Sequence, residues 1–173
     1  MYNTVQDTFL QGGANTIGEA RAGPDKNQWD LAIHKELKSM NDHCVWHVTW
    51  LPAGAKPIKH KWVFVKKINP DGTLNKFKAR LVACGYSQIH GQNYFETLSP
   101  TVSLDNVRVI LALAAHYDWE AHEVDVQTAF LNAPLKEYVY MTTPEGVNTQ
   151  GGATGNCVKL DKALYGLKQS SRT

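Results

Sequence analysis

Asp125 is the residue whose surroundings in this sequence best suit it for chemistry. It stands near the end of residues 121–126, which are predicted to form a short β-strand, and small and aromatic residues follow. A carboxylate at a strand end can hold a divalent cation, with the carbonyl of Val126 as a second hard oxygen ligand. An aspartate there also serves as a turn cap or a surface residue, and both interpretations stay open. Glu123 shares a strand face with Asp125, but a solvated strand edge is the more usual explanation for Glu120 and Glu123.

Positive charge is concentrated in one segment. The net charge of all 173 residues is only +2, yet residues 56–80 hold eight Lys or Arg against one acid, which makes this segment +7 and the remainder −5. Such a basic block is typical of a protein that binds a polyanion, and a solvated lysine-rich hairpin is the alternative. Lys78 and Arg80 alternate with Ala79 along a predicted strand, so both point to one face and can grip phosphates.

A helix is predicted upstream of the basic block. It starts at Asp25, which can cap it, and Gln28 stands at the capping-box position. Helical spacing predicts a buried stripe made of Trp29, Ala32, Ile33, Leu37 and Met40. Lys35, Glu36 and Lys38 fall outside that stripe.

The clearest local signal is a β-hairpin. Residues 62–68 predict one strand, Asn69-Pro70-Asp71-Gly72 a turn, and residues 77–83 the return strand.

Residues 104–117 predict a helix that is apolar on most sides and therefore central. Short strands are expected at 45–51, 139–141 and 158–160. Strands and helices do not alternate regularly, which favours the α+β class over a doubly wound sheet.

Composition and missing motifs exclude several classes of protein. No stretch approaches the roughly 20 apolar residues of a membrane span, and residues 1–13 lack the pattern of a signal peptide. The three cysteines are far apart and odd in number, which fits a reducing compartment, so an intracellular protein of the cytoplasm or nucleus is expected. The spacing of His43, Cys44 and His47 matches no four-ligand zinc frame. Phosphate loops of the Walker type and dinucleotide fingerprints are missing.

Six stretches, in order along the chain, together resemble the reverse transcriptases of Ty1/copia-type retrotransposons. They are Trp62-Val63-Phe64 with the turn at 69–72, Lys78 to Ala83 with Gly85-Tyr86-Ser87-Gln88, residues 94–100 (YFETLSP), residues 125–131 (DVQTAFL), Val139-Tyr140-Met141 with Pro144-Glu145-Gly146, and residues 164–169 (LYGLKQ). Each stretch alone is a weak signal, but their order makes the set specific. The resemblance covers nearly the whole chain beyond the first twenty residues.

The resemblance implies an RNA-directed DNA polymerase built like a right hand, of which this chain would form the fingers and the first half of the palm. Asp125 would be the first catalytic, metal-binding carboxylate, with the Val126 carbonyl as a second ligand to Mg²⁺ or Mn²⁺ in the intact enzyme. Thr128 and Ala129 would present backbone amides to the triphosphate. Phe130 would pack against the sugar and reject a 2′-hydroxyl.

The resemblance also implies the remaining nucleotide-binding residues and the partners. Lys78 and Arg80 would close on the incoming triphosphate or on the template, and Tyr165, Gly166 and Lys168 would support template and nucleotide. The partners would be an RNA or DNA template-primer, a deoxynucleoside triphosphate and the rest of a Pol polyprotein.

The sequence departs from the family pattern in ways that affect activity. Asn93, Cys84 and Ser171 stand where the family usually has Asp, Lys and Pro, and the chain stops before the family's second carboxylate motif, Tyr-x-Asp-Asp. These departures lead us to expect that residues 23–173 are a fragment without polymerase activity or bound metal of its own. Residues 1–22 are expected to be a linker or disordered terminus. A non-catalytic nucleic-acid-binding module and a decayed fragment without function are the alternatives.

Overall fold

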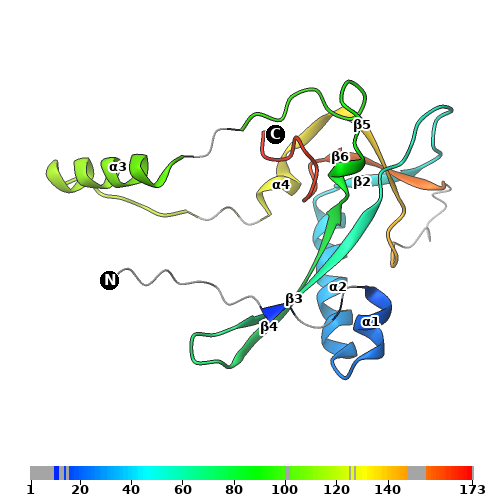
Figure 1. The fold of residues 1–173 in the computed structure, drawn as a ribbon, viewed down its shortest axis with the longest axis horizontal. Coiled ribbons are helices and arrows are strands. Elements are labelled where there is room, and N and C mark those ends of the chain that lie inside the picture. Colours follow the sequence, from blue (N-terminus) through cyan, green and yellow to red (C-terminus); the bar gives the residue numbers. More distant parts are fainter. Residues whose placement is uncertain are drawn as a thin grey trace.

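The computed structural model describes residues 10–11, 14, 16–99, 102–124, 126, 128–147 and 155–172. Its strands form two three-stranded antiparallel sheets (Figure 1). The first sheet has the order β1 (Leu10–Gln11), β3 (His60–Ile68) and β4 (Leu74–Ala83). The second has the order β2 (Trp46–Thr49), β6 (Cys157–Lys162) and β5 (Pro134–Thr142). With the helices described below, this confirms the α+β class.

The predicted hairpin is confirmed by β3 and β4. The two strands pair from His60 with Ala83 to Ile68 with Leu74. In the turn the backbone N–H of Asn69 donates to the Thr73 carbonyl at 2.8 Å, and Gly72 has a φ of +84°. Only a residue without a Cβ adopts that φ at no steric cost, which explains the Asn-Pro-Asp-Gly sequence.

The first long helix, α2 (Lys26–Asp42), lies against the hairpin. Its buried residues are Trp29, Ile33 and Met40, as the helical spacing predicted. The expected cap at Asp25 differs from the structure, because the Asp25 side chain makes no capping hydrogen bond. Its carboxylate instead accepts from Lys66 Nζ of β3 at 2.6 Å. This ion pair ties the start of the helix to the hairpin.

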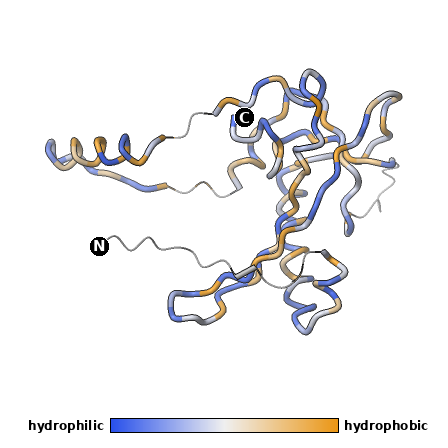
Figure 2. The backbone as a smooth tube through the Cα atoms, in the orientation of Figure 1, coloured by the Kyte–Doolittle hydropathy of each residue, from blue (hydrophilic) through white to orange (hydrophobic). Residues whose placement is uncertain are grey.

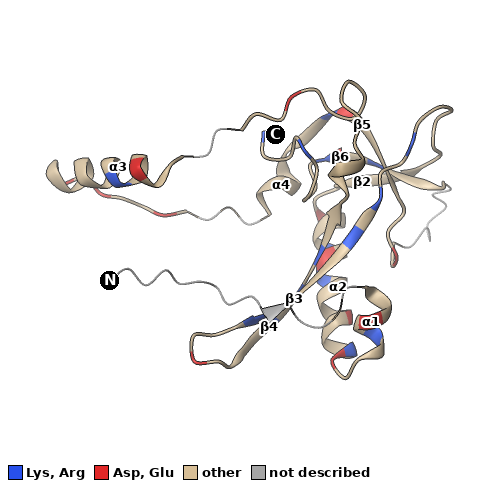
Figure 3. Cartoon of the chain, viewed as in Figure 1, with Lys and Arg blue, Asp and Glu red and all other residues tan. Residues whose placement is uncertain are grey.

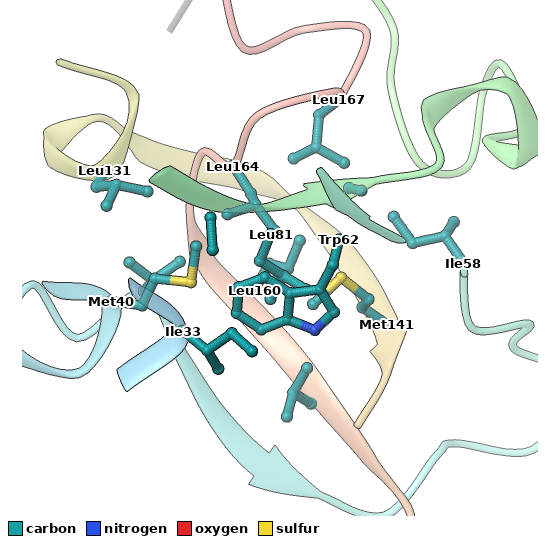
Figure 4. Packing of buried hydrophobic residues seen from close by; sticks show 14 of the residues in the cluster. Ile33, Met40, Ile58, Trp62, Leu81, Leu131, Met141, Leu160, Leu164 and Leu167 are labelled. Carbon is teal, nitrogen blue, oxygen red and sulfur yellow. The ribbon is translucent and has the colours of Figure 1, made fainter. Parts of the chain in front are cut away.

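One hydrophobic core joins α2 to both sheets. Figure 4 shows Trp62 and Leu81 of the hairpin among Ile33 of α2 and Leu160 of β6. Leu81 is completely buried, and Leu160 is 1% exposed. Fully burying a side chain of this size stabilises the fold by about 1.5–3 kcal/mol. The two sheets are therefore held in place by shared packing, with α2 as the common partner.

The N-terminal segment corrects one expectation. Residues 1–22 were expected to be a linker, but residues 17–22 form a helix, α1 (Ile17–Ala22), that contacts α2. Ile17 and Ala20 are buried in the core cluster, and the Thr16 side chain accepts from the Glu19 N–H at 3.2 Å as a cap. A short helix with only two buried residues produces too weak a periodic signal to be found from sequence.

The expected central helix forms but is not buried. It is α3 (Leu104–His116), capped by Ser103, whose side chain accepts from the Asn106 N–H at 3.3 Å. Among its residues only Ala114 is buried. Figure 1 shows α3 standing apart from the two sheets, and Figure 2 shows that hydrophobic residues continue along it. The prediction of burial was wrong. An apolar composition favours the burial of a helix, but burial also requires another element that packs against it.

The expected strand over 121–126 is not present in the described part of that segment. Residues 121–124 and 126 have no regular structure and are exposed, while Asp125 lies outside the described residues. Downstream, α4 (Ala129–Asn132) is one short turn of helix and leads directly into β5. The strands expected at 139–141 and 158–160 lie within β5 and β6. No helix of the described residues is both long and apolar enough to cross a membrane.

A pair of leucine substitutions tests the different environments of the hairpin and α3. Leu81→Ala should lower the free energy of unfolding by about 2–5 kcal/mol, because it leaves a cavity in a fully buried site. Leu111→Ala should change it by no more than about 0.5 kcal/mol, because Leu111 is 53% exposed. Urea unfolding of both variants measures the difference. Equal losses would show that α3 is packed against another surface in solution.

Candidate nucleic-acid interface

The centre of the basic block is β4. Lys78 and Arg80 share one face of this strand, and Ala79 between them is buried on the other side. Both cationic side chains are half-buried, and among the described residues neither forms an ion pair with a carboxylate. Burial, followed by the positive charges of Arg80, Lys67 and Lys76, lowers the pKa of Lys78. Figure 3 shows Lys and Arg residues along the hairpin. Mutual repulsion of this kind is relieved by an anion.

Three residues that are far apart in the sequence meet beside this face. The Phe130 and Tyr165 ring centroids are 5.3 Å apart with the rings at 85°, an edge-to-face contact. The Arg80 guanidinium carbon lies 5.6 Å from the Tyr165 ring centroid. Such contacts restrict both rings and the cation. We call this group the Arg80–Tyr165–Phe130 junction, and it brings three predicted site residues together.

The junction depends on a close approach between two backbones. The Ala83 N–H at the end of β4 donates to the Tyr165 carbonyl at 2.8 Å. Gly166 follows with a φ of +88°, and a Cβ added to it would overlap the Ala83 carbonyl oxygen. A Cβ on Gly85 would in turn overlap the Gly166 carbonyl oxygen. Gly166 therefore allows the segment to reach β4 and so places the Tyr165 ring.

Lys168, predicted to support template and nucleotide, contacts Tyr94 within the chain. Its Nζ donates to the Tyr94 hydroxyl at 3.1 Å and lies 4.6 Å from the centroid of the Tyr94 ring. Its backbone N–H donates to the buried side chain of Gln88 at 2.8 Å. Gln88 also donates to the buried Gln169 side chain at 3.0 Å. The structure thus shows Lys168 anchoring a loop, a contact that the sequence analysis missed.

The segment around Asp125, the predicted catalytic carboxylate, is only partly described. Asp125 lies outside the described residues, Val126 is 61% exposed, and Ala129 is exposed. Thr128 adopts the left-handed conformation with a φ of +53°. Its hydroxyl lies 3.4 Å from His43 Nε2 at the end of α2, close to the limit of a hydrogen bond. This contact links α4 to the helix that packs on the hairpin.

The described residues do not form a metal centre. Among them, no group of three or more His, Cys, Asp or Glu side chains is placed to hold a metal ion. Glu120 and Glu123 are exposed, in agreement with their interpretation as solvated residues. A divalent-ion site would therefore need ligands beyond the described residues.

Glu36 falls outside the predicted apolar stripe, yet it is partly buried in the structure. One of its carboxylate oxygens, Oε1, is buried and has no hydrogen-bond partner. Burial raises the pKa of Glu36, while a hydrogen bond from the Leu81 backbone and the charges of Arg80 and Lys78 lower it. The spacing of Trp29, Ile33, Glu36 and Met40 follows the three-and-four pattern of a buried face, which was the available signal.

Comparison with known proteins identifies the class to which this fold and interface belong. Residues 43–173 match the family model described as reverse transcriptase (RNA-dependent DNA polymerase). This range includes the hairpin and all three residues of the junction. The chain belongs to this reverse transcriptase family, which confirms the resemblance found in its motifs.

Three curated relatives are named as Pol polyproteins of transposons. The chain is 41% identical over 91% of its length to the retrovirus-related Pol polyprotein from transposon TNT 1-94 of Nicotiana tabacum. It is 39% and 37% identical, each over 84% of its length, to those from transposons RE1 and RE2 of Arabidopsis thaliana. The chain spans only 12%, 10% and 10% of these relatives. No solved structure matches the chain significantly.

Two glycine substitutions separate close approach from backbone conformation. Gly54 and Gly166 both have positive φ values, +81° and +88°, but no atom lies within 4 Å of a Cβ added at Gly54. Gly54→Ala should cost only the left-handed penalty, about 1–2 kcal/mol. Gly166→Ala should cost at least about 3 kcal/mol, because overlap with Ala83 is added. Urea unfolding measures both values, and similar losses would contradict the proposed role of Gly166.

Proposed function

We propose that this chain is the part of an RNA-directed DNA polymerase that contacts the incoming deoxynucleoside triphosphate and the template. The observation that carries the proposal is the junction, where Arg80, Tyr165 and Phe130 converge from three separate motifs. Cations beside aromatic rings are a combination suited to phosphates and to the stacked bases or sugars of nucleic acid. The family match over residues 43–173 supports the same interpretation.

The proposed roles follow from position in the fold. Lys78 and Arg80 bind phosphates from the hairpin, which with α2 corresponds to the fingers. Phe130 packs against the sugar, and its contact with Tyr165 holds the ring in one orientation. The second sheet and α4 correspond to the first half of the palm, so that residues 23–173 form one functional segment. Gly166 acts through the packing that it permits.

The catalytic carboxylate is proposed on the motif alone. We assign Asp125, with the carbonyl of Val126, to a divalent ion (Mg²⁺ or Mn²⁺) in the intact polymerase, and the amides of Thr128 and Ala129 to the triphosphate. The described residues hold no cluster that binds a metal by itself. We therefore propose that polymerisation requires further carboxylates from the Pol polyprotein, and that the work is done inside the cell on an RNA or DNA template-primer.

A non-catalytic nucleic-acid-binding module is the second candidate function. The +7 charge of residues 56–80 favours it, since binding through phosphates needs neither a metal nor Asp125. The two candidates share the hairpin and differ in whether nucleotide incorporation occurs once a complete palm is supplied. Two experiments separate them.

The first experiment measures the salt dependence of binding to duplex DNA. The 173-residue chain should bind weakly, and the logarithm of its affinity should fall with the logarithm of salt concentration by about 0.9 per phosphate neutralised. Lys78→Ala with Arg80→Ala should weaken binding to all sequences alike and reduce that slope by about two units. The matched control is Arg21→Ala with Lys38→Ala, because these cations pair with Asp30 and Asp42 on α2. Unchanged binding in the hairpin variant would contradict the assignment.

The second experiment joins the 173-residue chain to the segment that follows the matched region in the tobacco relative and measures primer extension. Asp125→Asn should reduce extension at least about a hundredfold, because a metal ligand contributes several kcal/mol of transition-state stabilisation. Binding of the template-primer should persist, since the substitution preserves shape and removes only one charge. Phe130→Ala serves as the comparison and should retain extension while accepting ribonucleotides more readily. Full activity of the Asp125→Asn chimera, or extension by the unextended chain, would contradict the proposal.

A further inference from the structure

Two segments from outside the sheet, α2 and the segment after β6, contact β4, whose outer edge is open. β4 is the last strand in the order β1-β3-β4, so its outer N–H groups need other partners. Among the described residues, the Ala83 N–H donates to the Tyr165 carbonyl, and the Leu81 backbone lies near enough to the Glu36 carboxylate of α2 to lower its pKa. Glu36 therefore sits on the same strand edge that carries the Arg80–Tyr165–Phe130 junction.

The Glu36 carboxylate is poorly compensated at this position. Its Oε1 oxygen is buried without a hydrogen-bond partner. Arg80 and Lys78 attract its charge, but neither is within ion-pair distance. A buried carboxylate that interacts with two cations from a distance stabilises them less than a direct ion pair does, and leaves both free to contact phosphates.

We propose that Glu36 is a positioning residue that sets the phosphate affinity of Lys78 and Arg80, so that its protonation and the binding of a polyanion favour each other. This inference rests on the proposed function of the hairpin. When Glu36 is ionised, it offsets part of the positive potential that attracts phosphates. When it is protonated, the two cations act undiminished. Thermodynamic linkage requires that a bound polyanion promotes the protonated form to the same extent.

The groups that face Glu36 are Arg80 and Lys78 on β4 and Tyr165 from the segment after β6. Arg80 stays cationic at all relevant pH values. Burial, and then Glu36, raises the pKa of Tyr165 above its ordinary value, so this phenol stays neutral. When the pH rises, Glu36 gains negative charge and Lys78, whose pKa is lowered, loses positive charge. Both changes weaken the attraction for phosphates. On α1, Arg21 pairs with Asp30 of α2.

The test uses the full 173-residue chain and fluorescein-labelled oligo(dT), whose phosphodiesters keep their charge between about pH 5 and about pH 8. Affinity of the wild-type chain should fall as the pH rises, and the part due to Glu36 should be about twofold to fivefold. Glu36→Gln should lose that part and keep near its low-pH affinity throughout. Glu137→Gln is the matched control, because Glu137 of β5 also has a buried, unpartnered carboxylate oxygen but lies in the other sheet. It should retain the wild-type profile.

The outcomes separate this inference from the proposed function. If Arg80→Ala weakens binding but Glu36→Gln keeps the wild-type pH profile, the role of Glu36 is wrong and the function of the hairpin stands. If Arg80→Ala binds like the wild type, the proposed function fails and this inference fails with it. If Glu36→Gln does not fold, carboxyl ¹³C NMR of the wild-type chain decides. Saturating oligo(dT) should move the Glu36 titration to higher pH, and an unmoved titration would overturn the inference.

Discussion

The packing of α2 on the β3–β4 hairpin is the interaction on which the rest of this structure depends. Trp29 contacts Phe64 and Phe77 edge-to-face, with ring centroids 5.2 and 4.6 Å apart, and Ile33 reaches the same core as Leu81. A twisted two-stranded hairpin is marginally stable in water by itself. The helix supplies the apolar surface that it needs. Because β6 packs into the same core, the helix also positions the second sheet relative to the cationic strand.

The edge of β4 connects this packing to function. A strand edge normally invites another chain, but here α2 contributes Glu36 and the segment after β6 contributes the Tyr165 carbonyl. The same two contacts place a carboxylate and an aromatic ring beside Arg80. The contacts that protect the edge are therefore the same contacts that build the interface. Gly166 permits them because it has no Cβ. A substitution that weakens the edge contacts disturbs the face that carries Lys78 and Arg80 as well.

The cationic and aromatic residues of the proposed polymerase site, and the segment around Asp125, depend on different parts of the fold. Lys78, Arg80, Tyr165 and Phe130 are held by elements that share the core, and their arrangement is complete within the described residues. The residues next to Asp125 are exposed and belong to no sheet, and α3 buries only Ala114. A strand forms when a partner accepts its hydrogen bonds, and an apolar helix is buried when a surface meets it. The arrangement of the basic residues is thus independent of the segment around Asp125.

The sequence by itself determined the local elements and the family. Asn-Pro-Asp-Gly specified the hairpin turn, the period of Trp29, Ile33 and Met40 specified one face of α2, and six ordered motifs specified the reverse transcriptase class. Tertiary structure alone decided where these elements lie. Glu36 is partly buried, and Asp25 forms an ion pair with Lys66 instead of a cap. Lys168 contacts Tyr94, and α3 stays exposed. Periodicity reports which side of an element is apolar, whereas contacts between residues far apart in the chain depend on which surfaces meet, and no local pattern contains that information.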